Sequence, residues 1–78
     1  MSSLLKLHDN EIKIIINIID TLKLEKNKIY SNFVFYNICN TFSDINKIEL
    51  NINKFFFQLD SSKIILIDNP NIYSFKII

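Results

Sequence analysis

The side chains best suited to contact a ligand lie in one stretch, from Ile52 to Leu59. Asn53 offers an amide that donates and accepts hydrogen bonds, Lys54 a positive charge, and Phe57 a flat apolar ring. On a helix these three project away from the apolar stripe that runs along the other side of the stretch. This combination predicts a recognition surface rather than a plain solvated helix face.

Catalytic chemistry has little support in the sequence. There is no Gly-rich phosphate loop, no catalytic triad spacing and no set of four metal ligands. Asp44 and Glu49 are five residues apart and do not face each other on a helix. His8 is a lone histidine, and Cys39 is expected to face the core. We therefore predict that the chain is not an enzyme and uses no cofactor or metal.

Length and composition predict a single domain over residues 1–78. One cysteine excludes an internal disulfide, and this favours a reducing intracellular compartment, cytoplasmic or nuclear. The longest apolar run, Ile12 to Ile19, is too short to span a bilayer, so no membrane association is expected. The formal net charge is +1, and every basic residue is lysine. Both facts argue against a transcription regulator of B-form DNA, which needs clustered positive charge and arginines.

Hydrophobic periodicity predicts three helices. A short leader, 1–8, precedes a first helix over 9–24, capped by Asp9 or Asn10. Its expected buried residues are Ile12, Ile15, Ile16, Ile19 and Leu22. Ile29-Tyr30 is a short extended piece before a second helix over 31–42, capped by Ser31 or Asn32. A third, recognition helix is predicted over 43–60, with Ser43-Asp44 as its cap and an apolar stripe of Ile45, Ile48, Ile52, Phe55, Phe56 and Leu59.

The last part of the chain predicts a β-hairpin over residues 63–77. The run from Lys63 to Asp68 is β-branched, Asn69-Pro70-Asn71 is a turn, and residues 72–77 alternate. Helix, short strand, helix, helix and hairpin is the order of an α+β winged helix-turn-helix, in which the third helix and the hairpin wing form one surface. A helical bundle with a C-terminal ribbon is the alternative. A winged helix also serves in protein interactions, so the fold does not decide the function.

The motif Ile52-Asn53-Lys54-x-Phe56-Phe57-x-Leu59 resembles the recognition helix of Z-alpha domains. These winged helices bind left-handed Z-DNA and Z-RNA and occur in an RNA-editing adenosine deaminase, a nucleic-acid sensor and poxvirus immune-evasion proteins. The segment from Pro70 to Phe75 is similar to the family's wing, where a proline pair precedes a Trp and an apolar strand. The resemblance covers the C-terminal half of the chain by motif and the first two helices only by pattern.

The resemblance implies a role for each matched residue. Asn53 would bind phosphate directly or through water, and Lys54 would contact a backbone phosphate. Phe57 would touch the exposed face of a syn guanine. Pro70 and Tyr73 would pack against the nucleic-acid backbone and support that aromatic ring.

The chain departs from the family pattern at several positions. Phe57 lacks the hydroxyl of the family's Tyr, and Glu49 stands where a Lys is frequent. Asn71 replaces the second proline and Tyr73 replaces the Trp. Lys47 is an accessory candidate for phosphate contact.

Two functions are therefore carried forward. The first is recognition of left-handed double-stranded DNA or RNA by backbone shape, with a role in blocking immune sensors that only the family resemblance suggests. The second is a protein-protein interaction module, a dimer or a subunit of a complex, with Leu50 and Phe57 of the third helix in the interface. Phosphate binding weakens as salt rises, whereas a hydrophobic interface barely responds.

Overall fold

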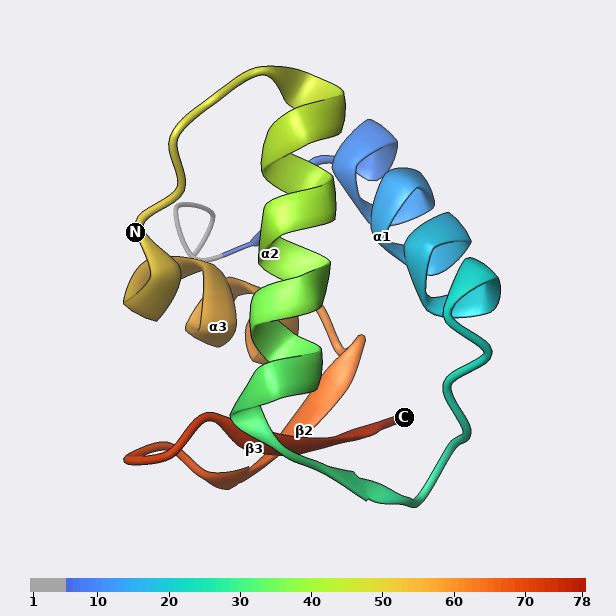
Figure 1. The fold of residues 1–78 in the computed structure, drawn as a ribbon, viewed down its shortest axis with the longest axis vertical. Helices are drawn as coiled ribbons and strands as arrows, with labels where there is room; N and C mark the ends of the chain where they lie inside the picture. Colours follow the sequence, from blue (N-terminus) through green and yellow to red (C-terminus); the bar gives the residue numbers. More distant parts are fainter. Residues whose placement is uncertain (1–5) are drawn as a thin grey trace.

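The computed structural model describes residues 6–78 and contains three helices and three strands in the predicted order. Figure 1 shows α2 in the centre, with α1 on one side, α3 on the other and the strands at the base. The elements are α1 (Asp9–Thr21), β1 (Ile29–Tyr30), α2 (Asn32–Asn46), α3 (Ile52–Ser61), β2 (Ile65–Asn69) and β3 (Ser74–Ile77). The predicted α+β class is confirmed, and the arrangement is consistent with a winged helix.

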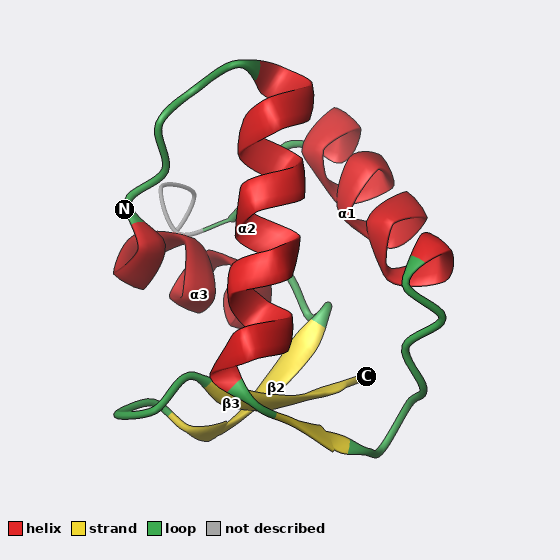
Figure 2. Ribbon diagram, in the orientation of Figure 1, coloured by secondary structure: helices red, strands yellow, loops and turns green. Residues whose placement is uncertain are grey.

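The predicted C-terminal hairpin is confirmed. Strands β2 and β3 pair antiparallel, with Leu66 opposite Lys76, and β3 also pairs with β1, so that β3 is the central strand (Figure 2). Tyr30 of β1 lies opposite Phe75 of β3. The early strand thus ties the start of α2 to the hairpin, and it positions the N-terminal end of that helix against the sheet.

The core is dominated by aromatic rings around Phe35 of α2, which is fully buried. Its ring packs edge-on against Phe56 at 4.7 Å between centroids and stacks on Tyr73 at 5.2 Å. Phe55 and Phe75 are also neighbours, each at 6.4 Å. Phe35 therefore joins α2 to α3, to β3 and to the turn that precedes β3.

Helix α1 begins at residue 9 as predicted, but its cap residue and its C-terminal end differ from the prediction. Its N-cap residue is His8, whose backbone N–H donates to the Glu11 carboxylate at 2.8 Å, so the predicted cap at Asp9 or Asn10 is wrong. The helix ends at Thr21 rather than at residue 24. Ile18 is buried and Ile16 is 48 % exposed, which reverses the predicted burial of Ile16.

Part of the predicted leader 1–8 packs on the domain. The Leu7 side chain is buried, and its backbone N–H donates to Ser62 Oγ at 2.9 Å. Residues 1–5 of the predicted leader lie outside the described residues. No helix within residues 6–78 has both the length and the apolar character needed to cross a membrane.

The predicted boundary between the second and third helices is wrong. Ser43 and Asp44, the predicted cap of the third helix, lie inside α2, which continues to Asn46. Helix α3 starts only at Ile52. Ile45 and Ile48, predicted to belong to the buried stripe of the third helix, are exposed.

The helix break at Lys47 has a clear backbone cause. Lys47 is the C-cap of α2 and takes a left-handed conformation, with φ 53° and ψ 49°. Glycine usually occupies such positions, and the chain contains none. Four further residues have positive φ, namely Lys23, Asn27, Lys63 and Tyr73. The sequence therefore lacks the signal that normally marks the end of a helix.

Replacing Phe35 by Ala is expected to lower the free energy of unfolding by about 3–5 kcal/mol, because it leaves a cavity between α2, α3 and the hairpin. Urea unfolding followed by circular dichroism measures the change. The matched control is Phe33→Ala in the same helix, where the side chain is 80 % exposed and the change should stay within about 0.5 kcal/mol. Equal losses for the two variants would contradict the described core.

Lys47→Gly should raise the free energy of unfolding by about 0.5–1 kcal/mol. Glycine removes the steric cost of a left-handed backbone, and its larger loss of conformational entropy on folding cancels only a small part of that gain. Lys47→Ala removes the same charge without relieving the backbone, so its stability should match the parent. Thermal or urea unfolding of the pair decides the point. A loss of stability in Lys47→Gly would show that α2 does not end at this residue.

Candidate nucleic-acid interface

Helix α3 is fixed to the domain by its inner side. Phe55, Phe56 and Leu59 are buried. The helix start is defined by Asn51, whose side-chain oxygen accepts a hydrogen bond from the Lys54 backbone N–H at 3.1 Å. A short helix anchored by three large side chains and a side-chain cap presents its outer residues in a fixed orientation.

The three residues singled out on α3 all lie on its solvent side. Asn53 and Lys54 are exposed, and Phe57 is 40 % exposed, so Phe57 is not part of the core. Asn53 and Phe57 are four residues apart and therefore neighbours on the helix surface, with Lys54 beside them. An amide, an ammonium group and an apolar ring thus share one short helical surface.

The hairpin turn is braced by two local hydrogen bonds. The backbone N–H of Asn71 donates to Asn69 Oδ1 at 3.0 Å, and Ser74 Oγ donates to Asp68 Oδ2 at 3.0 Å. Pro70 is exposed in this turn. The turn therefore has a defined shape and presents Pro70 to solvent.

Tyr73 connects the wing to both α2 and α3. Its ring stacks on Phe35 at 5.2 Å, meets Phe56 edge-on at 5.1 Å and contacts Tyr36 at 6.0 Å. Phe57 packs edge-on against Phe56 at 6.1 Å. Among the aromatic pairs of residues 6–78, Tyr73 and Phe57 are not direct partners, so any support of Phe57 by the wing acts through Phe56.

The loop before α3 places the remaining candidates apart from the helix surface. Lys47 ends α2, and Leu50 is partly buried against the core. Leu50 therefore does not share the outer surface of α3 with Phe57, which corrects the interface predicted for a protein partner. The cause is the later start of α3, because residue 50 precedes the helix instead of lying on it.

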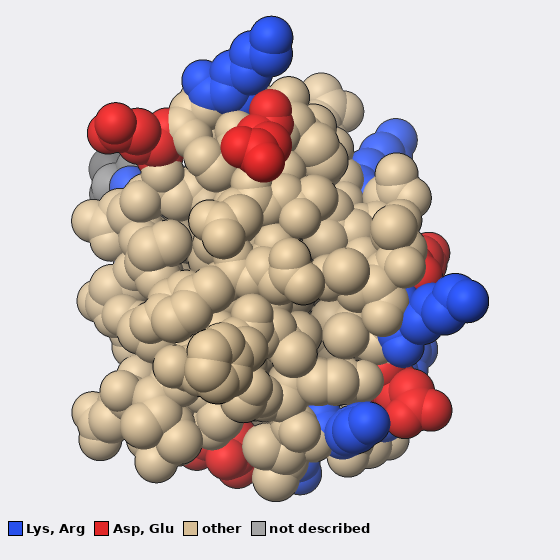
Figure 3. All heavy atoms as spheres, viewed as in Figure 1, with Lys and Arg blue, Asp and Glu red and all other residues tan. Residues whose placement is uncertain are grey.

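Charge is sparse on the surface that faces the viewer in Figure 3. Basic and acidic side chains lie mainly at its rim, and the area over α2 and the hairpin turn is largely uncharged. Within α3 itself Lys54 is the only basic residue and Asp60 the only acidic one. This surface therefore offers a ligand mainly uncharged groups.

Tyr36 is a surface residue that the sequence did not single out. It lies on α2 with 39 % of its surface exposed, and its ring contacts Tyr73. Phe33, one helical turn earlier, is 80 % exposed. One signal in the sequence could have identified them. Phe33 and Tyr36 are aromatic residues three positions apart, and neither belongs to the apolar side of that helix.

The predicted burial of Cys39 is confirmed. The residue is buried on α2, and desolvation raises the pKa of its thiol from 9.0 to about 12. The thiolate is the reactive form, and burial disfavours it. Cys39 is therefore a core residue with an unreactive thiol.

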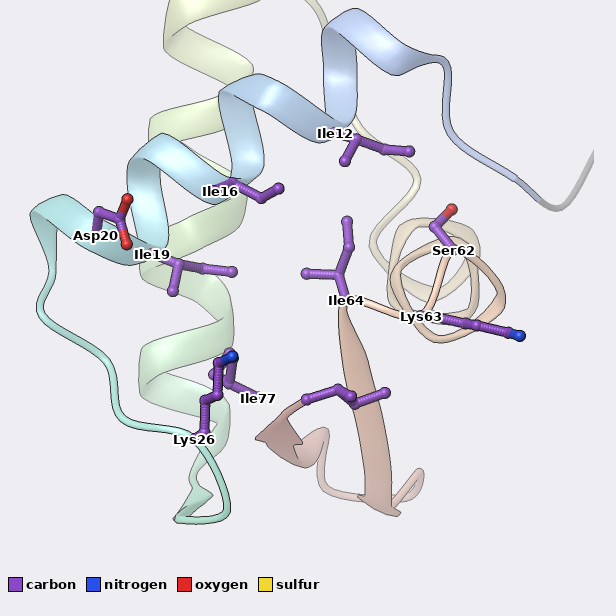
Figure 4. Close-up of a pocket in the computed structure, with 10 residues that line it drawn as sticks. Ile12, Ile16, Ile19, Asp20, Lys26, Ser62, Lys63, Ile64 and Ile77 are labelled. Atoms are coloured by element: carbon purple, nitrogen blue, oxygen red, sulfur yellow. The ribbon is translucent and has the colours of Figure 1, made fainter.

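An apolar cleft with a volume of about 310 Å³ lies away from the α3 surface. Figure 4 shows Ile12, Ile16 and Ile19 of α1 facing Ile64 across it, while the Lys63 side chain points away. None of the candidate site residues lines this cleft. It accounts for the partial exposure of Ile16 but adds no polar group to the candidate interface.

No family model, curated protein or solved structure matches the chain. The likeness to Z-alpha domains therefore rests on the short motifs in α3 and the wing. Within residues 6–78 there is also no group of three or more His, Cys, Asp or Glu side chains placed to hold a metal ion.

The Cys39 thiol should react at least about 100-fold more slowly in the folded chain than in urea. At pH 8 a pKa of about 12 leaves roughly one thiolate in 10,000, and the core also excludes the reagent. Absorbance after addition of an aromatic disulfide reagent measures both rates. Rapid modification of the native chain would contradict the described burial.

The free energy of unfolding should fall above pH 9. In that range the unfolded chain releases the Cys39 proton, whereas the folded chain still holds it because burial raises the pKa of the thiol.

Proposed function

We propose that the chain binds left-handed double-stranded DNA or RNA through α3 and the hairpin wing. The observation that carries this proposal is the placement of Asn53, Lys54 and Phe57 on the solvent side of a helix whose other side is locked into the core. The wing is joined to that helix by the edge-on contact of Tyr73 with Phe56.

Rigid spacing is what such a function requires. The left-handed duplex has a zigzag backbone, and its phosphates are spaced differently from those of the B form. Donors in a fixed arrangement therefore select the shape without reading base edges. Asn53 and Lys54 supply the donors, and the exposed ring of Phe57 supplies an apolar surface for the face of one base. Binding shifts the duplex toward the left-handed form by the difference in affinity for the two forms.

The small net charge sets the expected strength of the interaction. With Lys54 as the phosphate-contacting cation on α3, the logarithm of the binding constant should fall with the logarithm of salt concentration with a slope of about −1. That is a shallow slope for a duplex-binding protein. A slope this small means that shape accounts for most of the discrimination between the two duplex forms, and counterion release for a small part.

A domain of this kind would compete with other readers of left-handed duplexes. If it acts beside immune sensors that bind the same form, occupancy of the duplex would withhold it from them. This biological role follows from the Z-alpha resemblance and depends on the binding activity.

A second candidate is a protein-binding module. It is favoured by apolar side chains exposed at the surface, among them Phe33 at 80 %, Ile72 at 57 % and Leu66 at 54 %. A partner on such a surface would bind with an affinity that changes little between low and high salt. This behaviour separates the two functions in one titration series.

An alternating CG duplex titrated with the chain should show inversion of its long-wavelength circular dichroism bands, because binding draws the duplex into the left-handed form. A mixed-sequence duplex should stay in the B form under the same conditions. Asn53→Ala should weaken the effect about 10-fold or more through loss of a phosphate contact.

The matched control is Asn17→Ala, an exposed asparagine on α1, which should behave as the parent does. An unchanged B-form spectrum at saturating protein would rule out the proposed function. Equal effects of the Asn53 and Asn17 substitutions would place the site away from α3.

A further inference from the structure

Tyr36 lies on the outer side of α2, and its ring packs against two other rings. The buried residues of α2 are Phe35, Ile38, Cys39 and Phe42. Tyr36 lies beside that stripe, 39 % exposed, with its ring tilted against Phe35 at 5.9 Å and edge-on to Tyr73 at 6.0 Å. Two ring contacts therefore fix the direction of its side chain.

A continuous series of ring contacts links Tyr36 to the proposed interface. Tyr36 meets Tyr73 at 6.0 Å, Tyr73 meets Phe56 at 5.1 Å, and Phe56 meets Phe57 at 6.1 Å. The series starts on α2, passes through the base of the wing and ends on the outer side of α3. Tyr36 and Phe57, its two ends, are exposed to the same extent. Tyr36 is thus joined to Phe57 through the Tyr73 ring and the buried Phe56 ring.

The hydroxyl of Tyr36 has no hydrogen-bond partner within residues 6–78. Tyr30 differs, because its hydroxyl accepts a hydrogen bond from the Glu25 backbone N–H at 2.6 Å. A phenol hydroxyl donates one hydrogen bond and can give it to a phosphate oxygen. Since the Tyr36 ring is already engaged by Phe35 and Tyr73, its hydroxyl is the group left for a ligand.

We propose that Tyr36 is a further nucleic-acid contact, with its hydroxyl donating a hydrogen bond to a phosphate oxygen of the duplex bound by α3 and the wing. This inference rests on the proposed function and extends its site onto α2. The chemistry fits a surface with few lysines, because an uncharged donor binds phosphate at a defined position without adding net charge. Its contribution is directional and independent of counterion release.

Tyr36→Phe is the decisive variant, because it removes the hydroxyl and keeps both ring contacts. It should weaken binding to the left-handed CG duplex about 5- to 10-fold. The slope of log affinity against log salt should stay the same between 50 and 200 mM salt. Lys54→Gln should behave differently and make that slope shallower by about one unit.

The matched control is Tyr30→Phe, a tyrosine whose hydroxyl is bonded within the domain. It should bind the duplex as the parent does. Urea unfolding of all three variants checks that the fold is retained, and Tyr36→Phe should unfold at the parent's midpoint.

The outcomes separate this inference from the function beneath it. Parent affinity in Tyr36→Phe, together with weakened binding in Asn53→Ala, would overturn the role of Tyr36 and leave the proposed function standing. A steep change of the salt slope in Tyr36→Phe would also overturn it, since an uncharged contact cannot cause one. Absence of duplex binding by the parent chain would overturn both.

Discussion

The contact of Phe35 with Phe56 and Tyr73 determines how the parts of this domain are arranged. Phe35 comes from α2, Phe56 from α3 and Tyr73 from the base of the wing, and their rings lie 4.7 to 5.2 Å apart. Rings at these distances interlock as well as bury apolar surface. The angle between α3 and the hairpin therefore depends on this cluster, and so does any surface that the two elements form together.

The proposed interface therefore has a fixed shape but little charge. The groups on its outer side are few and mostly uncharged, so a partner cannot be attracted by a strong field. What the domain offers instead is a fixed arrangement of an amide, an ammonium group and aromatic rings. Under the proposed function such a surface would discriminate by shape, which would suit an unusual backbone better than an ordinary B-form duplex. The exposed apolar side chains nearby are the feature that a protein partner would use instead.

The absence of glycine explains the main error in the predicted elements. Five residues with side chains occupy positive φ, among them Lys47 at the end of α2. Without Gly, Ile45 and Ile48 continue the apolar spacing of Ile52 and Phe55, so the sequence predicts one helix from residue 43. In the structure Ser43 belongs to α2, and α3 is only ten residues long. Local spacing cannot detect a break that depends on backbone conformation alone.

The sequence by itself determined the order of elements, the hairpin, the burial of Cys39 and the exposure of Asn53 and Lys54. These follow from periodicity within a single segment, where spacing fixes which side chains share a surface. The tertiary structure decided that Tyr73 contacts Phe56 rather than Phe57, and that Tyr36 lies beside it. Such contacts join residues far apart in the chain. They depend on how whole helices pack, and no local pattern encodes that.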